Sequence, residues 1–245
     1  MSCNPKLLGQ LYRLYRPLAD GATGVVYRGL QVSVGRPVAI KVMHGPVVGD
    51  PDIRRRLLRD ARLIASFAHP NIVHVHDYGT TPEGIVFVVM ELLHGNTLAQ
   101  ELAMERPFAP RRALEIAVQI ADALDAAHQR AVLHRRLTPN NVFLLFDPLS
   151  RDRVKLVDFG LSRRTAYDAH DDLRALGGVL HLMVGDAPPR TLGRLVDALL
   201  AKRLESAAVA RAQLQALIDQ TTTVELRRRP RRQDPRTAQH TVTPS

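Results

Sequence analysis

The chain has 245 residues, enough for one or two domains that bury a substantial core. Its 45% hydrophobic and 24% charged residues exclude a largely disordered chain, and the single Cys3 excludes an internal disulfide or a cysteine-based zinc site and favours a reducing compartment. The net charge is +10, but residues 226–245 hold six arginines and one aspartate, so the remaining chain is only mildly basic and is not itself predicted to bind nucleic acid.

Residues 11–91 are predicted to form strands interrupted by one helix. The helix shows apolar side chains at helical spacing, and the strands are short β-rich runs separated by turn residues such as Gly35. The longest apolar run is far shorter than the roughly 18 residues of a membrane span, and the N-terminus lacks a secretion signal, so a cytoplasmic protein is expected. The predicted elements are strands at 25–27, 38–40, 72–78 and 85–90 and a helix at 52–67.

After residue 92 the pattern becomes mainly helical. The first long helix has Pro110 in its first turn, a favourable start. From Thr221 onward the chain alternates Thr, Arg and Pro with almost no apolar residue, which predicts disorder. The chain is therefore expected to be α+β, with a small β-rich half and a larger helical half. The predicted elements are helices at 110–130, 171–184 and 192–219 and strands at 142–145 and 154–157.

Five residues carry candidate chemistry. Gly21 and Gly24 lie between two strands, where glycines allow backbone N–H groups to approach phosphates. Taken alone, a plain hairpin turn explains them better, because Ala19 stands where the first glycine of a G-x-G-x-x-G pattern would be. Lys41 lies in an apolar strand of a chain that uses arginine almost everywhere else, which indicates a need for a compact ammonium group. Asn141 and Asp158 each adjoin a strand and carry the oxygen donors that Mg²⁺ prefers.

Taken in order, these motifs resemble the Hanks-type bacterial Ser/Thr protein kinase family over residues 11–220. The resemblance implies a two-lobed protein-kinase-like fold. It also implies a lead at 1–10, an N-lobe at 11–91, a truncated C-lobe at 92–220 and a disordered tail at 221–245. The motifs are the glycine loop, Ala39-Ile40-Lys41, His69-Pro70-Asn71-Ile72-Val73, the loop from His134 to Asn141, and Asp158-Phe159-Gly160.

The resemblance assigns roles to individual residues and implies ATP and Mg²⁺ as ligands. Lys41 matches the lysine that holds the α- and β-phosphates, and Asp60 matches its partner, which is normally the longer Glu, so a weaker or absent ion pair is expected. Asn141 and Asp158 match the two magnesium ligands. Met90 matches the gatekeeper, and the backbone of Glu91 and Leu93 matches the contacts to the adenine edge. The remaining matches are residues that pack against the adenine ring at Val26, Ala39 and Phe143, and stacked residues that link the lobes at Ile64, Val75, His134 and Phe159, with Asp172 beneath them. The apolar members of both groups fit ordinary core packing as well.

The catalytic loop departs from the family pattern. Arg136 occupies the position of the aspartate that accepts the substrate proton, and a guanidinium has no acceptor atom. Thr138 replaces the catalytic-loop lysine. Only eleven residues separate Gly160 from Asp172, where the family has a longer activation segment, and the C-lobe is shortened after Pro189.

These departures favour a pseudokinase that binds ATP and acts as a regulator or scaffold. One alternative is an active Ser/Thr protein kinase with an atypical catalytic loop. Another is an adaptor that acts through its Arg-rich tail on nucleic acid or an acidic partner. No membrane association is expected, and the protein partner stays open.

Overall fold

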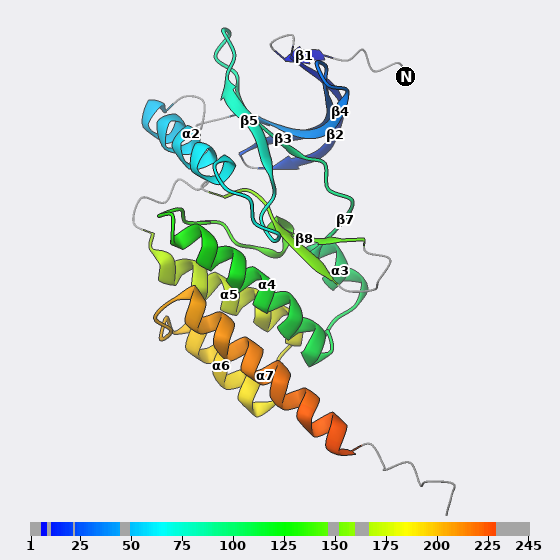
Figure 1. Ribbon diagram of the computed structural model, residues 1–245, viewed down its shortest axis with the longest axis vertical. Helices are drawn as coiled ribbons and strands as arrows, with labels where there is room; N and C mark the ends of the chain where they lie inside the picture. The colour runs from blue at the N-terminus through cyan, green and yellow to red at the C-terminus, as the bar shows by residue number, and fades with distance from the viewer. Residues whose placement is uncertain are drawn as a thin grey trace, which may run out of the picture.

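The computed structural model describes residues 6–8, 11–21, 23–44, 50–146, 152–159 and 167–228. A β-rich lobe lies above a helical lobe, and the chain passes between them after β6 (Figure 1). Within these residues no helix combines the length and apolar character needed to cross a membrane.

The N-lobe is built on one six-stranded sheet, whose strand order is β1-β2-β3-β4-β6-β5 and whose neighbouring strands are all antiparallel. Helix α2 follows β4 and contacts β5. The elements are β1 (Lys6–Leu8), β2 (Tyr12–Gly21), β3 (Gly24–Gln31), β4 (Arg36–Met43), α2 (Pro51–Ala65), β5 (Val75–Thr80) and β6 (Val86–Glu91).

Strand β4 separates two parts of the core because alternate side chains point to opposite faces of a sheet. Val38 and Ile40 are completely buried in a small cluster of their own. Ala39 and Met43 belong instead to the main core that continues into the C-lobe. Lys41 shares their alternation, so its side chain is directed toward the space between the lobes.

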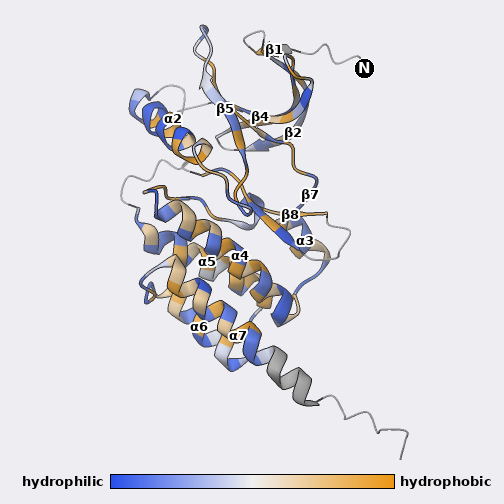
Figure 2. Cartoon of the chain, in the orientation of Figure 1, coloured by the Kyte–Doolittle hydropathy of each residue, from blue (hydrophilic) through white to orange (hydrophobic). Residues whose placement is uncertain are grey.

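Helix α2 covers most of the helix predicted at 52–67, and it begins one residue earlier than predicted. The Asp50 carboxylate caps it by accepting hydrogen bonds from the backbone N–H groups of Asp52 and Ile53, and Pro51 fits the first turn. Leu57 and Ile64 are buried on the face toward the core. Hydrophilic and hydrophobic residues alternate along the helix (Figure 2), as expected for a helix with one buried face.

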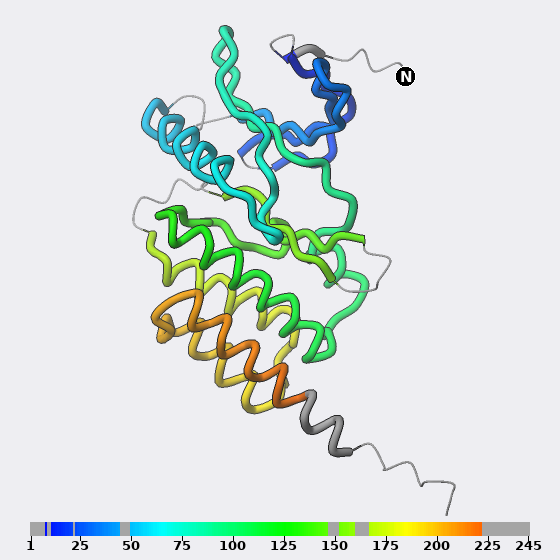
Figure 3. The backbone as a smooth tube through the Cα atoms, in the orientation of Figure 1, coloured from blue at the N-terminus to red at the C-terminus, as the bar shows by residue number. Residues whose placement is uncertain are grey.

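The C-lobe is organised around α4, which contacts α5, α7 and β9. Nine of its residues are buried, mostly Ala, Leu and Ile, so neighbouring helices can approach it closely. Figure 3 shows α7 running alongside α4. The elements are β7 (Gly95–Thr97), α3 (Leu98–Met104), α4 (Pro110–His128), the short 3-10 helix η1 (Pro139–Asn141), β8 (Val142–Leu145), β9 (Arg153–Leu156), α5 (Ala169–Val184), α6 (Arg190–Leu200) and α7 (Ala207–Arg228).

The structure differs from the sequence-based prediction in three segments. Residues 6–8, assigned to an N-terminal lead, form β1 and pair with β2; three residues are too few for a recognisable alternation. The helix predicted at 192–219 is two helices, because Lys202 adopts a left-handed conformation between them.

The third difference is the start of the tail. Helix α7 continues to Arg228, so the disorder predicted from Thr221 is wrong for residues 221–228. The Thr221 hydroxyl donates to the Leu217 carbonyl at 2.9 Å, and β-branched residues cost an established helix only tenths of a kcal/mol each. The tail from residue 229 lies outside the described residues.

Candidate functional site

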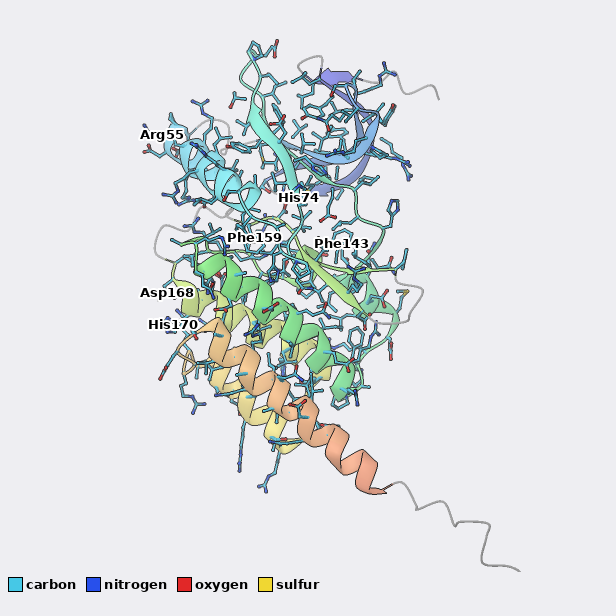
Figure 4. All side chains as sticks on the ribbon, in the orientation of Figure 1. Arg55, His74, Phe143, Phe159, Asp168 and His170 are labelled. Atoms are coloured by element: carbon cyan, nitrogen blue, oxygen red, sulfur yellow. The ribbon has the colours of Figure 1, made fainter. Side chains whose placement is uncertain are left out.

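The motifs that the sequence singled out converge where the two lobes meet. Strands β3 and β4 contribute from above, the end of β6 from one side, and the loops before and after β8 and β9 from below. Figure 4 shows Phe143 and Phe159 in this region, between the sheet and the helices.

Lys41 and Asp158 are bound to each other at the centre of the site. The Lys41 Nζ donates to the Asp158 Oδ2 at 2.6 Å, and only 4% of the Lys41 side chain is exposed. Asp158 has a φ of 66°, an unfavourable conformation for a residue with a side chain. The residues matched to phosphate binding and to magnesium binding are therefore within contact, and a bound nucleotide would have to share or displace this ion pair.

Asp60 pairs with Arg135 and not with Lys41, which corrects the partner assigned from the sequence. Its Oδ2 accepts a hydrogen bond from the Arg135 Nη1 at 2.7 Å, and its Oδ1 accepts one from the Arg59 Nη2 at 3.0 Å. The side chain of Asp60 is 2% exposed and that of Arg135 is 12% exposed. This nearly buried ion pair joins α2 directly to the catalytic loop, while Lys41 joins the sheet to Asp158.

Asn141 is held beside Asp158 by backbone contacts. The Asn141 Nδ2 donates to the Arg136 carbonyl at 2.7 Å, and the Val157 N–H donates to the Asn141 carbonyl at 3.0 Å. No hydrogen bond engages the amide oxygen of Asn141 among the described residues, so this oxygen is available as a ligand. No cluster of three His, Cys, Asp or Glu side chains suited to a metal occurs in the part of the chain described. One carboxylate, one amide oxygen, phosphates and water suit Mg²⁺, which keeps much of its hydration, so the donor set fits.

The residues matched to adenine contacts surround the end of β6. Ala39 pairs with Met90 in adjacent strands, and Val26 lies on β3 beside Lys41. Leu93 follows β6 and Phe143 lies on β8, both half-buried. Together these residues provide two apolar walls, one from each lobe.

The backbone at Glu91 is firmly held. Its N–H donates to the His74 carbonyl at 3.0 Å, so an adenine edge can meet only its carbonyl. The Glu91 carboxylate accepts hydrogen bonds from the Lys155 Nζ at 2.7 Å and from the His74 N–H at 2.8 Å. No local sequence signal indicates this ion pair, because Lys155 lies 64 positions away on β9.

The two glycines of the loop have different roles. A side chain at Gly24 would overlap the backbone carbonyl of Val42 on β4, so glycine is needed there for strand packing. A Cβ at Gly21 would meet only the Gly24 carbonyl at 3.7 Å, an ordinary contact. Gly21 thus has room above it for a ligand, and Ala22 lies outside the described residues.

Behind Met90 lies a small, mainly apolar cavity of about 40 Å³. Ile64, Val75 and Phe159, three of the residues matched to the stack between lobes, line it. The Phe159 ring contacts the His134 ring with centroids 4.5 Å apart. Lys41 and Asp158 supply the polar part of its wall, so the cavity adjoins the candidate nucleotide site.

Asp172, at the start of α5, orders the catalytic loop. It is completely buried and accepts hydrogen bonds from the backbone N–H groups of His134 at 2.8 Å and Arg135 at 2.9 Å, and His128 Nε2 lies 2.9 Å away. Burial alone would raise the pKa of Asp172. The hydrogen bond with His128, together with the charge of His134 and the hydrogen bond from its backbone N–H, holds the pKa of Asp172 below its usual range. Burial lowers the pKa of His134, whose Nε2 has no partner among the residues described.

Arg136 follows this anchored segment. Its N–H donates to the His134 Nδ1 at 3.4 Å, and its carbonyl accepts from Asn141. Arg136 is half-buried as a residue, and its guanidinium has no hydrogen-bond or ion-pair partner in the described ranges. The segment at 160–166 lies outside those ranges, and α5 begins soon afterwards, with Asp168 as its N-cap.

The fold and the site together define a protein kinase domain. A sequence profile described as "Protein kinase domain" matches residues 12–182. That match covers most of the chain, so the chain belongs to the protein kinase family. The similar curated proteins are bacterial Ser/Thr kinases, which places the chain in the Hanks-type bacterial group of that family. This confirms the family resemblance predicted from the motifs.

Curated relatives agree with this assignment. Serine/threonine-protein kinase pkn2 of Myxococcus xanthus is 36% identical over 186 residues, which are 76% of this chain and 22% of that protein. Serine/threonine-protein kinase PknE of Mycobacterium bovis is 37% identical over 179 residues, 73% of this chain and 30% of that protein. The chain thus spans less than a third of either relative.

Solved structures confirm the two-lobed fold. The crystal structure of the Mycobacterium tuberculosis PknI kinase domain matches with a TM-score of 0.71 at 26% identity, covering 86% of this chain and 97% of that one. A variant of the same domain matches with a TM-score of 0.73 at 28% identity, covering 90% and 100%. The match covers those kinase domains almost completely, so the C-lobe of this chain has counterparts for nearly all of their residues.

Proposed function

We propose that this domain binds ATP with Mg²⁺, is impaired in phosphoryl transfer, and acts as a regulatory or scaffolding pseudokinase in the cytoplasm. The observation that carries the proposal is Arg136, a guanidinium at the position where the family has its proton-accepting aspartate. Guanidinium groups stay protonated and have no acceptor, so Arg136 cannot take the proton of a substrate hydroxyl.

The nucleotide-holding parts support the first half of the proposal. Lys41 would contact the phosphates, and Asn141 with Asp158 would hold Mg²⁺, which neutralises charge on the phosphates when bound. The amide orientation of Asn141 is fixed by its hydrogen bond to the Arg136 carbonyl, and the Val157 N–H holds the adjacent backbone. The site therefore needs little rearrangement beyond loosening the Lys41–Asp158 ion pair.

The parts that would promote transfer are weakened in three ways. Arg136 offers no acceptor, Thr138 carries no charge, and Asp60 is committed to Arg135. Phosphoryl transfer depends on positioning and charge stabilisation more than on covalent chemistry, so losing these groups removes most of what a kinase contributes.

Nucleotide binding is tested by the melting temperature with and without millimolar Mg-ATP. A ligand at 100 times its dissociation constant stabilises by about 2.7 kcal/mol, which raises the melting temperature by several degrees for a chain of this size. Lys41→Met should shrink the shift, whereas Arg62→Gln, at an exposed position on α2, should leave it unchanged. Absence of a shift in the wild type would contradict nucleotide binding.

An active Ser/Thr kinase is the second candidate, favoured by the names of the curated relatives and by the retained Lys41, Asn141 and Asp158. It requires another group to accept the substrate proton. An adaptor acting through the Arg-rich tail is a third candidate; binding of nucleic acid or an acidic protein that is lost when residues 229–245 are deleted would favour it.

A further inference from the structure

Among the described residues of the site, the charged side chains are paired with one exception. Lys41 is neutralised by Asp158 at 2.6 Å, and Arg135 is neutralised by Asp60 at 2.7 Å. Arg136 follows Arg135 in the chain and its carbonyl accepts a hydrogen bond from Asn141, yet its guanidinium contacts no carboxylate in the described part of the chain. A half-buried cation without a counter-charge is unfavourable in the free protein and forms an attractive position for an anion.

Hydrogen bonds hold the backbone of Arg136 in place. The Arg136 carbonyl is 2.7 Å from the Asn141 Nδ2, and the Asn141 carbonyl in turn accepts from Val157, next to Asp158. The backbone of Arg136 is therefore held close to both candidate magnesium ligands. The adjoining His134 and Arg135 are held through their N–H groups by the buried Asp172, so the root of the side chain is rigid.

A phosphate is the anion that matches this position. The guanidinium fork binds phosphate oxygens through two parallel hydrogen bonds, and such charge-assisted bonds are stronger than neutral ones. Lys41 belongs to the sheet and is matched to the α- and β-phosphates, whereas Arg136 belongs to the catalytic loop of the other lobe.

We propose that Arg136 binds the terminal phosphate of a nucleoside triphosphate and makes the domain prefer ATP to ADP. The inference rests on the proposed nucleotide binding. With a guanidinium on the γ-phosphate and no acceptor for a substrate proton, the triphosphate is held without being transferred. The domain would then report the ATP-bound state to its partner.

The test measures dissociation constants for Mg-ATP and Mg-ADP by isothermal titration calorimetry on the full chain. The wild type should bind ATP about 10- to 100-fold more tightly than ADP, the range for hydrogen bonds to charged groups. Arg136→Gln should bring the ratio close to one by weakening ATP while leaving ADP binding unchanged. Arg62→Gln, an exposed arginine on α2, is the matched control and should keep the wild-type ratio.

Two outcomes overturn the inference in distinguishable ways. If the wild type binds ATP but Arg136→Gln leaves the ATP-to-ADP ratio unchanged, Arg136 does not contact the terminal phosphate, while the proposed nucleotide binding stands. If the wild type binds neither nucleotide, the proposed function itself fails. Binding of ADP by Arg136→Gln shows that this variant is folded, so loss of ATP preference alone supports the inference.

Discussion

Replacing Asp60 with Asn tests whether the Asp60–Arg135 ion pair holds α2 to the catalytic loop. The substitution keeps the size of the side chain but removes its charge, which leaves the guanidinium of Arg135 nearly buried beside a neutral group. Removing one partner of a buried ion pair costs about 3–5 kcal/mol. At roughly 2–4 °C per kcal/mol for a chain of this size, the melting temperature should fall by about 6–20 °C.

Asp52→Asn is the matched control on the same helix. Asp52 pairs with Arg55, and their side chains are 80% and 78% exposed, so its loss should cost less than about 1 kcal/mol. Arg135→Gln should fall between the two, because Arg59 still contacts Asp60. Urea unfolding followed by circular dichroism gives the three free energies. Equal losses for Asp60→Asn and Asp52→Asn would refute the reasoning.

Two further predictions concern the glycine loop and pH. Gly24→Ala should lower the unfolding free energy by about 1–3 kcal/mol, because the added methyl group overlaps β4. Gly21→Ala should lower it by less than about 0.5 kcal/mol and should reduce only the affinity for ATP. Equal losses of unfolding free energy in the two variants would contradict the two roles. Burial lowers the pKa of His134, and also of His69 and His76, so below pH of about 6.5 the unfolded chain binds protons that the folded chain does not. The unfolding free energy should therefore fall from pH 7 to pH 5. His134→Phe should reduce the dependence of the unfolding free energy on pH by up to about 1.4 kcal/mol per pH unit. An unchanged pH dependence in this variant would contradict the role assigned to His134.

The sequence predicts the elements of the site well because their signals are local. The helix expected at 52–67 is observed as α2 at Pro51–Ala65, since both its cap and its apolar spacing can be read from neighbouring residues. The strand that carries Lys41 is likewise found, because β-branched residues flank it.

Ion-pair partners could not be predicted in the same way. The family resemblance places Asp60 at the site, but Arg135 lies 75 positions away, and only the fold decides which cation Asp60 meets. The same holds for Glu91 and Lys155. The end of α7 was missed for a different reason, since a polar helix continuing from a packed one has no apolar pattern of its own.

Transfer of radiolabelled phosphate from Mg-ATP to a generic basic protein substrate tests the central claim most directly. The wild type, Asp158→Ala and Arg136→Asp are assayed side by side at ATP concentrations that saturate the wild type. We expect no transfer above the Asp158→Ala background for any of them, because restoring one acceptor at position 136 leaves Thr138 and the short segment before α5 unchanged. Robust transfer by the wild type that Asp158→Ala abolishes would contradict the account and identify an active kinase.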